Sequence, residues 1–317
     1  MKVLIVRNDR MGDLLMSLPA LHEIRASFPE AHLTLLLQKG LEPLLEGHPD
    51  VDRLLVWEPA KGQGLGAIWG WAGRLRRERF DAALVLNPTR LFHAASCLAG
   101  IPLRIGYRRK CGILLNRTVP DTKARRDLHE VEYNLELVRL LNSSSQTQCH
   151  PAPALYLPSR PETDREAEEL LKGRGISADE RPIAIHPWTS NPAKGWPLES
   201  FLEVARRLAK GGRPVLILGG SECRGLMDPV KPQMGSGPVD LVGRVPLKVL
   251  PALLRRCSVL ISNDSGPVHV AAAVGTSTIV VAPESHARLM ARWRPLGDGH
   301  RILLSPRVED LVAAASP

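Results

Sequence analysis

The sequence has few aromatic residues and none of the common spaced cysteine or glycine motifs. Only 4% of its 317 residues are aromatic. The five cysteines are an odd number and no two of them have C-x-x-C spacing, which argues against a disulfide framework and against a zinc site. Reduced thiols in a reducing compartment are the simplest interpretation. The G-x-G-x-x-G fingerprint is also missing, so a dinucleotide-dependent dehydrogenase is not favoured.

Long apolar runs are missing as well. The apolar run at the N-terminus ends at Val6, and Arg7, Asp9 and Arg10 follow at once, so it is too short for the core of a signal peptide. The most apolar longer stretch, residues 267–283, contains several polar residues and falls short of a membrane span. It is more typical of a buried helix followed by a buried strand. We therefore expect a cytoplasmic protein, one that can still touch a membrane surface.

The net charge of +9 is spread over both halves of the chain. Three local basic clusters stand out: Arg74, Arg76, Arg77 and Arg79; Arg104, Arg108, Arg109 and Lys110; Lys123, Arg125 and Arg126. Such clusters attract polyanions or anionic lipid, although a solvated basic face is the alternative. A nucleic-acid-binding protein is disfavoured because aromatic residues are few, no RNA-binding motif is visible and the basic residues are dispersed.

Both halves of the chain alternate short apolar runs with helical patterns. The runs predict strands at Lys2–Arg7, His32–Leu37, Arg53–Trp57, Asp81–Leu86 and Arg104–Tyr107, and then at Pro182–His186, Pro214–Leu218, Val239–Val242, Val259–Ser262 and Thr278–Val281. Helices are expected at Leu14–Ser27, Gly64–Arg79, Leu91–Ala99, Thr163–Gly173, Leu198–Lys210, Leu247–Arg256 and Val268–Val274. This alternation predicts an α/β fold of βαβ units with parallel sheets covered on both faces.

The pattern is interrupted at Asn142–Arg160, which is first polar and then rich in proline. Such a segment is typical of a linker. It divides the chain into an N-terminal Rossmann-like domain, residues 1–155, and a C-terminal one, residues 156–317. Two facing Rossmann-like domains of this kind form the architecture called GT-B. Ligands of open α/β sheets bind at the carboxyl ends of the strands, so we expect the site in the cleft between the domains.

The segment from Ser262 to His269 follows a predicted strand and opens an apolar helix. Ser265 and Gly266 can present backbone N–H groups at the helix start, where the helix dipole favours phosphate. His269, one turn further on, can add a donor. The alternative is a helix that is merely capped by Asp264 or Ser265.

A second segment, His186 to Pro197, also lies between a strand and a helix. The hydroxyl groups of Thr189 and Ser190, together with the ammonium group of Lys194, would neutralise a pyrophosphate. A solvated loop lysine is the alternative interpretation. We expect the adjoining Trp196 to fix the loop rather than to contact a substrate.

A third segment, Arg7 to Leu14, follows the first strand and offers a carboxylate at Asp13. Sugar transfer with inversion needs a base that takes the proton of the acceptor hydroxyl as it attacks the anomeric carbon. Asp13 is our candidate and Asp9 is the competing one. The residues alone favour a simpler role for Asp13, as a cap of the helix that begins at Leu14.

These segments resemble glycosyltransferase family 9, the lipopolysaccharide heptosyltransferases, over nearly the whole chain. The resemblance rests on Arg7 to Pro19, on His186 to Pro197, on Leu218 to Glu222 and on Leu241 to Glu284, which contains S-N-D-S-G-P-V-H and A-A-A-V-G-T. It implies a GT-B fold, an inverting transfer that needs no metal and no cofactor, and ADP-L-glycero-β-D-manno-heptose as the donor substrate. The implied acceptor is the inner core of lipopolysaccharide, Kdo or a first heptose on lipid A.

The resemblance also implies roles for individual residues. It makes Asp13 the general base, which reverses the preference for a helix cap. The donor-binding residues would be Thr189, Ser190, Lys194, Glu222, Asp264, Ser265, Gly266 and His269, with Glu222 resembling a ribose ligand. The anionic acceptor would be held by Arg10, Arg108, Arg109 and Lys110, and we expect the Lys123–Arg126 cluster to contribute. The enzyme would be a monomer that touches the cytoplasmic face of the inner membrane.

The chain departs from the family pattern at three places near the expected donor site. Trp188 stands where a small residue is common, Gly195 stands where a basic residue is common, and Pro283-Glu284-Ser285 replaces a more common Gly-Pro-Thr. The donor sugar is therefore left open. The alternatives are a glycosyltransferase of the same fold that uses another nucleotide sugar, and a sugar-nucleotide 2-epimerase, which would need paired acid and base groups.

Overall fold

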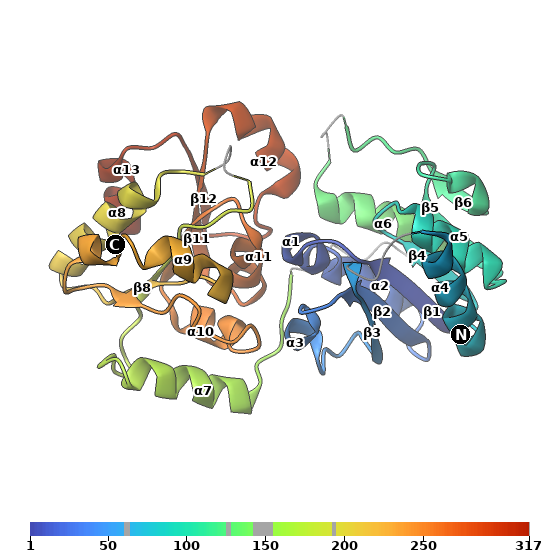
Figure 1. Cartoon of the computed structure of the whole chain (residues 1–317), viewed down its shortest axis with the longest axis horizontal. Coiled ribbons are helices and arrows are strands. Elements are labelled where there is room, and N and C mark those ends of the chain that lie inside the picture. The colour runs from blue at the N-terminus through green and yellow to red at the C-terminus, as the bar shows by residue number, and fades with distance from the viewer. Residues whose placement is uncertain (60–63, 125–127, 142–154, 192–194, 317) are drawn as a thin grey trace. The chain divides into compact units, whose positions relative to one another are not determined.

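The computed structural model describes residues 1–59, 64–124, 128–141, 155–191 and 195–316. The chain forms two compact units, Met1–Ala154 and Leu155–Pro317 (Figure 1). The change of unit falls within the segment predicted as a linker, although residues 142–154 lie outside the described part of the chain.

The first unit contains a six-stranded parallel sheet with the strand order β3-β2-β1-β4-β5-β6. The strands are β1 Lys2–Arg7, β2 His32–Gln38, β3 Arg53–Trp57, β4 Ala82–Val85, β5 Leu103–Tyr107 and β6 Arg117–Val119. The helices are α1 Met11–Leu15, α2 Leu18–Ser27, α3 Glu42–Leu45, α4 Leu65–Glu78, α5 Arg90–Leu98 and α6 Glu130–Leu141, with a 3₁₀ turn η2 at Gly112–Leu114. In β1 the residues from Val3 to Val6 are at most 1% exposed, because helices cover both faces of a parallel sheet.

The second unit repeats this plan, with the strand order β12-β11-β10-β7-β8-β9. Its strands are β7 Ile183–His186, β8 Val215–Ile217, β9 Val239–Asp240, β10 Val259–Asn263, β11 Ser277–Ala282 and β12 His300–Leu304. Its helices are α7 Pro161–Lys172, α8 Leu198–Lys210, α9 Arg224–Met227, α10 Leu250–Arg256, α11 Gly266–Ala273, α12 Ala287–Trp293 and α13 Val308–Ala315, with 3₁₀ turns η4 Ser221–Cys223, η5 Lys231–Met234 and η6 Glu284–His286.

Both strand orders are the doubly wound order, in which the chain winds outward first on one side of the first strand and then on the other. The first strand of each unit along the chain, β1 or β7, lies between two others. The second strand of the unit is on one side and the fourth, β4 or β10, is on the other. The winding therefore reverses between β1 and β4 and between β7 and β10. The carboxyl ends of these strands are the places where ligands of such sheets bind.

The predicted α/β class and all ten predicted strands are confirmed, with shifts of a few residues at their ends. The single helix predicted at Leu14–Ser27 is wrong, because α1 ends at Leu15 and α2 begins at Leu18. Pro19 lies in the first turn of α2, where it needs no hydrogen-bond partner for the N–H that it lacks. The edge strands β6 and β12 and the helices α3, α6, α9, α12 and α13 were not predicted.

Candidate functional site

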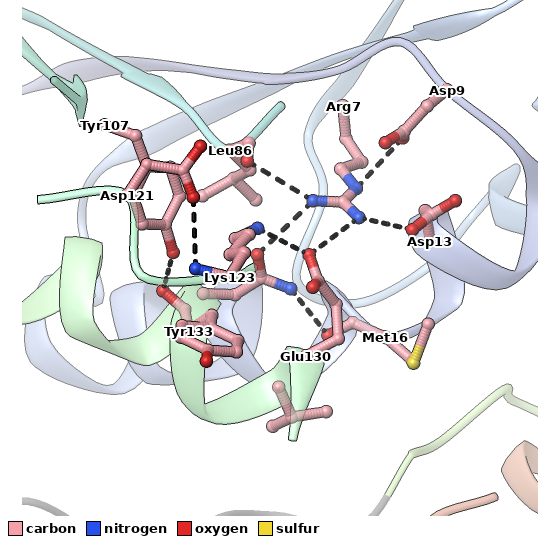
Figure 2. A network of polar contacts seen from close by, with 12 residues as sticks. Arg7, Asp9, Asp13, Met16, Leu86, Tyr107, Asp121, Lys123, Glu130 and Tyr133 are labelled. Carbon is pink, nitrogen blue, oxygen red and sulfur yellow. Dashed lines mark hydrogen bonds and ion pairs between the residues drawn. The ribbon is translucent and has the colours of Figure 1, made fainter. Parts of the chain in front are cut away.

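The carboxyl end of β1 carries a buried arginine that forms ion pairs with several acidic side chains (Figure 2). Arg7 ends β1 and is 1% exposed. Its Nη2 lies 2.9 Å from Asp13 Oδ1 and 3.1 Å from Glu130 Oε1, and its Nε lies 3.0 Å from Asp9 Oδ1. A buried charge is tolerated only when it is paired, and three carboxylates surround this one. They hold the pKa of Arg7 above its usual range against the opposing effect of burial.

Asp13 is positioned by a short helix rather than used as its cap. Helix α1 begins at Met11 after the N-cap residue Arg10, and Asp13 lies in its first turn. The role of Asp13 as a cap of a helix beginning at Leu14, considered from the sequence, is therefore wrong. The carboxylate instead accepts a hydrogen bond from Arg7, and 18% of the side chain remains exposed. It is thus fixed in direction while still reachable from solvent, as a base that meets a substrate hydroxyl must be.

Asp9, the competing candidate, lies beside the same guanidinium. Burial raises its pKa, Arg7 opposes this, and the neighbouring Asp13 and Glu130 add to it, with a net pKa of about 7. Asp9 therefore takes up a proton near neutral pH more readily than an ordinary carboxylate.

Helix α6 completes the cluster from a distant part of the sequence. Glu130, at the start of α6, accepts hydrogen bonds from Arg7 and from Lys123 Nζ, the latter at 2.7 Å. Asn134 accepts a hydrogen bond from Arg7 Nη1 at 3.3 Å and donates one to the carbonyl oxygen of Met16 at 3.0 Å. Sequence reasoning missed both residues. The buried Arg7 after an apolar strand signals that an acid must neutralise it, but not that this acid lies 123 positions away.

The predicted acceptor cations differ in their exposure and in their partners. Arg10, Arg108, Arg109 and Lys110 are exposed. Arg109 is paired with Asp121 at 3.0 Å. The expectation that Lys123 offers its charge to an acceptor is wrong, because Lys123 is 8% exposed and its ammonium group lies on Glu130 and over the Tyr107 ring. Its neighbours Arg125 and Arg126 lie outside the described residues.

A cavity of about 310 Å³ opens between the end of β3 and α4 in the first unit. Its walls include Trp57, Trp71, Arg74 and Glu58. None of the residues predicted for the site lines it. It stands apart from the Arg7 cluster and we assign it no part in the chemistry.

In the second unit the two predicted phosphate-binding segments meet at the carboxyl ends of β7 and β10. These strands are direct neighbours, with Ser262 paired to His186. Asn263, which is fully buried, accepts a hydrogen bond from the backbone N–H of Trp196 at 2.9 Å and donates one to the carbonyl oxygen of Pro187 at 2.5 Å. Asn263 thus ties the two segments together, a role that sequence reasoning did not assign to it. Trp196 fixes the loop through this bond, and its ring packs against Phe201.

The start of α11 has no side-chain cap. Ser265 occupies the N-cap position without a side-chain hydrogen bond to the helix. Its hydroxyl group instead contacts Ser262 Oγ at 3.0 Å and His186 Nδ1 at 3.2 Å. Burial lowers the pKa of His186 to about 4, so the imidazole is neutral at neutral pH. With its hydroxyl engaged there, Ser265 does not act as the helix cap considered from the sequence, which is compatible with an anion at this helix end.

The remaining predicted donor residues lie on the same edge of the second sheet. Thr189 and Ser190 follow β7, and Glu222 lies in η4, directly after β8. His269 is 4% exposed and lies in the first part of α11, and Asp264 lies between β10 and α11. Lys194 lies outside the described residues. The structure thus brings the described candidates to the carboxyl ends of three neighbouring strands.

Trp188 does not face this edge. Its ring is 9% exposed and belongs to the core of the second unit, and its indole N–H donates to the carbonyl oxygen of Leu218 at 2.9 Å. A Cβ on Gly219 would overlap this indole. The departure from the family pattern at this position therefore changes the packing of the core rather than presenting a large ring to a donor.

Two absences concern only the part of the chain that the structure describes. Within it, no group of three or more His, Cys, Asp or Glu residues is arranged to hold a metal ion. No helix there is both long and apolar enough to cross a lipid bilayer.

The chain is similar to known heptosyltransferases in sequence and in structure. It is 25% identical to lipopolysaccharide heptosyltransferase 2 of Escherichia coli K12 over 289 residues, which covers 89% of this chain and 82% of that protein. Among solved structures, the ADP-heptose LPS heptosyltransferase II of E. coli has a TM-score of 0.82 at 23% identity, with 99% of this chain and 97% of that chain covered. The E. coli heptosyltransferase WaaC with ADP has a TM-score of 0.75 at 20% identity, with the same coverage.

These structural neighbours confirm the predicted GT-B fold, and the sequence profile of one family identifies the enzyme class. The profile described as "Glycosyltransferase family 9 (heptosyltransferase)" matches residues 68–310, which is most of the chain. The protein belongs to glycosyltransferase family 9, the heptosyltransferase family, and is a glycosyltransferase.

Proposed function

We propose that the protein transfers heptose from ADP-L-glycero-β-D-manno-heptose to the inner core of lipopolysaccharide, with inversion at the anomeric carbon. The acceptor is lipid A carrying Kdo, or its heptosylated form. The observation that carries this proposal is the carboxylate of Asp13, held by a buried arginine and still partly exposed. The names of the relatives, which include heptosyltransferase 2 and a heptosyltransferase with ADP, support the donor and the acceptor class.

In the proposed reaction the acceptor hydroxyl group lies beside Asp13, in the N-terminal unit. Its oxygen attacks the anomeric carbon while its proton passes to the Asp13 carboxylate. The bond between the anomeric carbon and the phosphate oxygen breaks, and the electron pair leaves with ADP. Removing one positively charged or dipolar group that is aimed at the developing charge typically raises the activation free energy by about 3 to 4 kcal/mol.

The donor binds to the C-terminal unit in this proposal. Its diphosphate lies at the start of α11, near Ser265, Gly266 and His269. Thr189, Ser190 and Lys194 contact the same phosphates, Asp264 lines the loop, and Glu222 binds the ribose. Because protein groups neutralise the leaving diphosphate, we expect transfer to proceed unchanged in excess EDTA.

We further propose that the enzyme is a monomer that touches the cytoplasmic face of the inner membrane. The loop after β5 supports the membrane contact. Ile113 is 93% exposed, and the exposed cations Arg108, Arg109 and Lys110 precede it in the same loop. An apolar side chain beside several cations suits an anionic lipid surface, where the acceptor resides. The same cations, with Arg10, would hold the acidic groups of the acceptor.

Transfer from ADP-heptose to deacylated Kdo–lipid A and to its heptosylated form tests the proposal. The wild type should turn over with one of these acceptors. Asp13→Asn should lose about 10²- to 10⁴-fold in kcat, the contribution of a positioned general base. Its affinity for ADP, measured by calorimetry, should stay unchanged. Glu136→Gln, which removes a charge elsewhere in α6, is the matched control. Lack of turnover on both acceptors, with no binding of ADP-heptose, would refute heptose as the donor sugar.

A further inference from the structure

The buried guanidinium of Arg7 is shared between the candidate base and a second carboxylate. Nη2 of Arg7 donates to Asp13 Oδ1 at 2.9 Å and to Glu130 Oε1 at 3.1 Å (Figure 2). Glu130 is fully buried, and the same Oε1 atom accepts a hydrogen bond from Lys123 Nζ at 2.7 Å. Glu130 therefore lies between two cations, one of which it shares with Asp13.

Among the described residues, the ion pairs of this cluster join three carboxylates, Asp9, Asp13 and Glu130, to the cations Arg7 and Lys123. The carboxylates therefore lie close to one another around Arg7. Burial, together with the nearby Asp13 and Glu130 and against the effect of Arg7, raises the pKa of Asp9 to about 7.

We propose that Glu130 is a positioning residue for Asp13, acting through Arg7. By taking one of the two hydrogen bonds of Arg7 Nη2, Glu130 fixes the guanidinium and limits how strongly it stabilises the ionised Asp13. Asp13 therefore keeps its tendency to accept a proton although it contacts an arginine. This inference rests on the proposed function, in which Asp13 is the base.

The way α6 packs on the first unit supports a positioning role. Glu130 and Asn134 are four residues apart, so they lie on the same face of α6. Asn134 binds Arg7 Nη1 and also the carbonyl oxygen of Met16, the C-cap residue of α1. One face of α6 thus holds both the arginine and the helix that carries Asp13, through two side chains that are fully buried.

The charged and titratable groups around Asp13 come from several elements. Among the described residues they include Arg7 from β1, Asp9 and Arg10 from the segment before α1, Glu130 from α6, Lys123 and Asp121 from the segment before α6, and Tyr107 and Tyr133 behind Lys123. Tyr107 stays protonated because burial, and then Glu130, raise its pKa. Removing the charge of Glu130 leaves Arg7 to stabilise the ionised forms of Asp13 and Asp9 more strongly. The proton affinity of Asp13 should then fall, by about one pH unit for a neighbouring charge acting through one shared cation.

A titration of aspartate side chains followed by ¹³C NMR tests the inference without needing turnover. The Asp13 signal is identified by its loss in Asp13→Asn. Glu130→Gln should lower the midpoint of the Asp13 titration and shift the acidic limb of the kcat profile to lower pH. Glu136→Gln removes one charge from the same helix and should leave both unchanged. A midpoint that stays in place or rises in Glu130→Gln would overturn the inference.

A second variant separates charge from geometry. Glu130→Asp keeps the negative charge but draws it back from Arg7, so kcat should fall about tenfold while the KM for the donor stays the same. Glu130→Asp also tests the inference if Glu130→Gln does not fold. An unchanged kcat in Glu130→Asp would contradict a positioning role. Full activity of Asp13→Asn would instead refute the proposed base. An inactive Asp13→Asn with an unmoved midpoint in Glu130→Gln would refute only the role of Glu130.

Discussion

The side-chain amide of Asn263 bridges two loops of the second unit, through the backbone N–H of Trp196 and the carbonyl oxygen of Pro187. The residue ends β10 and is fully buried, so removing the amide takes away the partner that both backbone groups have in the core. The loop between β7 and α8 is thereby held at the place where we propose that the diphosphate binds.

Replacing Asn263 by alanine should therefore weaken both folding and donor binding. Two backbone groups would lose their side-chain partner, and such a loss costs about 1 to 3 kcal/mol where the group stays buried. We expect a lower free energy of unfolding in urea and at least about tenfold weaker binding of ADP by calorimetry. Gln233→Ala, which removes an exposed amide from the same unit, is the control and should change neither quantity. Unchanged ADP affinity in Asn263→Ala would show that the loop is held by other contacts.

His269 should matter for the leaving group more than for stability of the fold. It lies in the first part of α11, the helix whose start we assign to the diphosphate. His269→Ala should reduce kcat by about 10²- to 10³-fold, as expected when one donor to a developing negative charge is removed. The comparison is His300→Ala in the same unit, on a side chain at the start of the edge strand β12, which should retain wild-type kcat. Equal kcat values for the two variants would argue against the role of His269.

Gly219 and Trp188 should behave as a coupled pair. Because a Cβ at position 219 would overlap the Trp188 indole, Gly219→Ala should destabilise the second unit by about 1 to 3 kcal/mol. Trp188→Leu should also be destabilising, since it leaves a cavity and removes the donor to the Leu218 carbonyl oxygen. The double variant should be less destabilised than the sum of the two. Strict additivity in urea unfolding would show that the clash is avoided in another way.

Asp9 should make the stability of the protein depend on pH. Its pKa in the folded protein is about 7, above the value of about 3.9 in an unfolded chain. Between these values the folded protein holds a proton that the unfolded chain has lost, so this carboxyl destabilises the fold increasingly as pH rises from about 4 to 7. Asp9→Asn should therefore gain stability relative to wild type across this window, and the gain should level off above pH 7.

Urea unfolding at pH 4.5, 6 and 7.5 measures this effect. Glu46→Gln, on an exposed side chain of the same unit, provides the control and should follow the wild type at each pH. A stability difference between Asp9→Asn and wild type that does not change with pH would contradict the assignment of a raised pKa to Asp9.

The loop that carries Ile113 should direct the protein to anionic lipid. Ile113→Asp, and separately the combined change of Arg108, Arg109 and Lys110 to glutamine, should each reduce binding to vesicles that contain phosphatidylglycerol by about tenfold or more. Vesicles of phosphatidylcholine alone should bind the wild type weakly. Leu65→Asp replaces another exposed apolar residue, on α4, and tests whether the effect belongs to this loop. Equal losses in the two aspartate variants would point to a general effect of surface charge.

Much of the fold could be predicted from the sequence because buried parallel strands are continuous apolar runs. Lys2–Arg7 and Val259–Asn263 show this plainly, and the polar residues that follow them lie where ligands of such sheets bind. The edge strands β6 and β12 escaped prediction for the opposite reason. Arg117–Val119 and His300–Leu304 are only partly buried and carry arginine or histidine, so they lack the pattern of a central strand.

The contacts within the site were harder to predict than its segments. The pairing of Arg7 with Glu130 joins residues that no local pattern connects, and it depends on how α6 packs on the sheet. Trp188 was placed near the donor because of its position in the sequence, whereas its side chain turns into the core. Lys123 was grouped with surface cations on its charge alone. Its burial depends on the ion pair with Glu130, which the sequence does not reveal.

The distance along the chain between Arg7 and α6 has a consequence for how the protein is made. On the ribosome, β1 and its neighbouring strands leave the tunnel well before Glu130 and Asn134 do, so Arg7 at first has only the nearby Asp9 and Asp13 as acidic partners. The first unit draws all six strands from the residues up to Val119, and α6 follows directly. Docking of α6 can therefore complete the burial of Arg7 during translation, and the N-terminal unit can close its polar cluster while the second unit is still being synthesised.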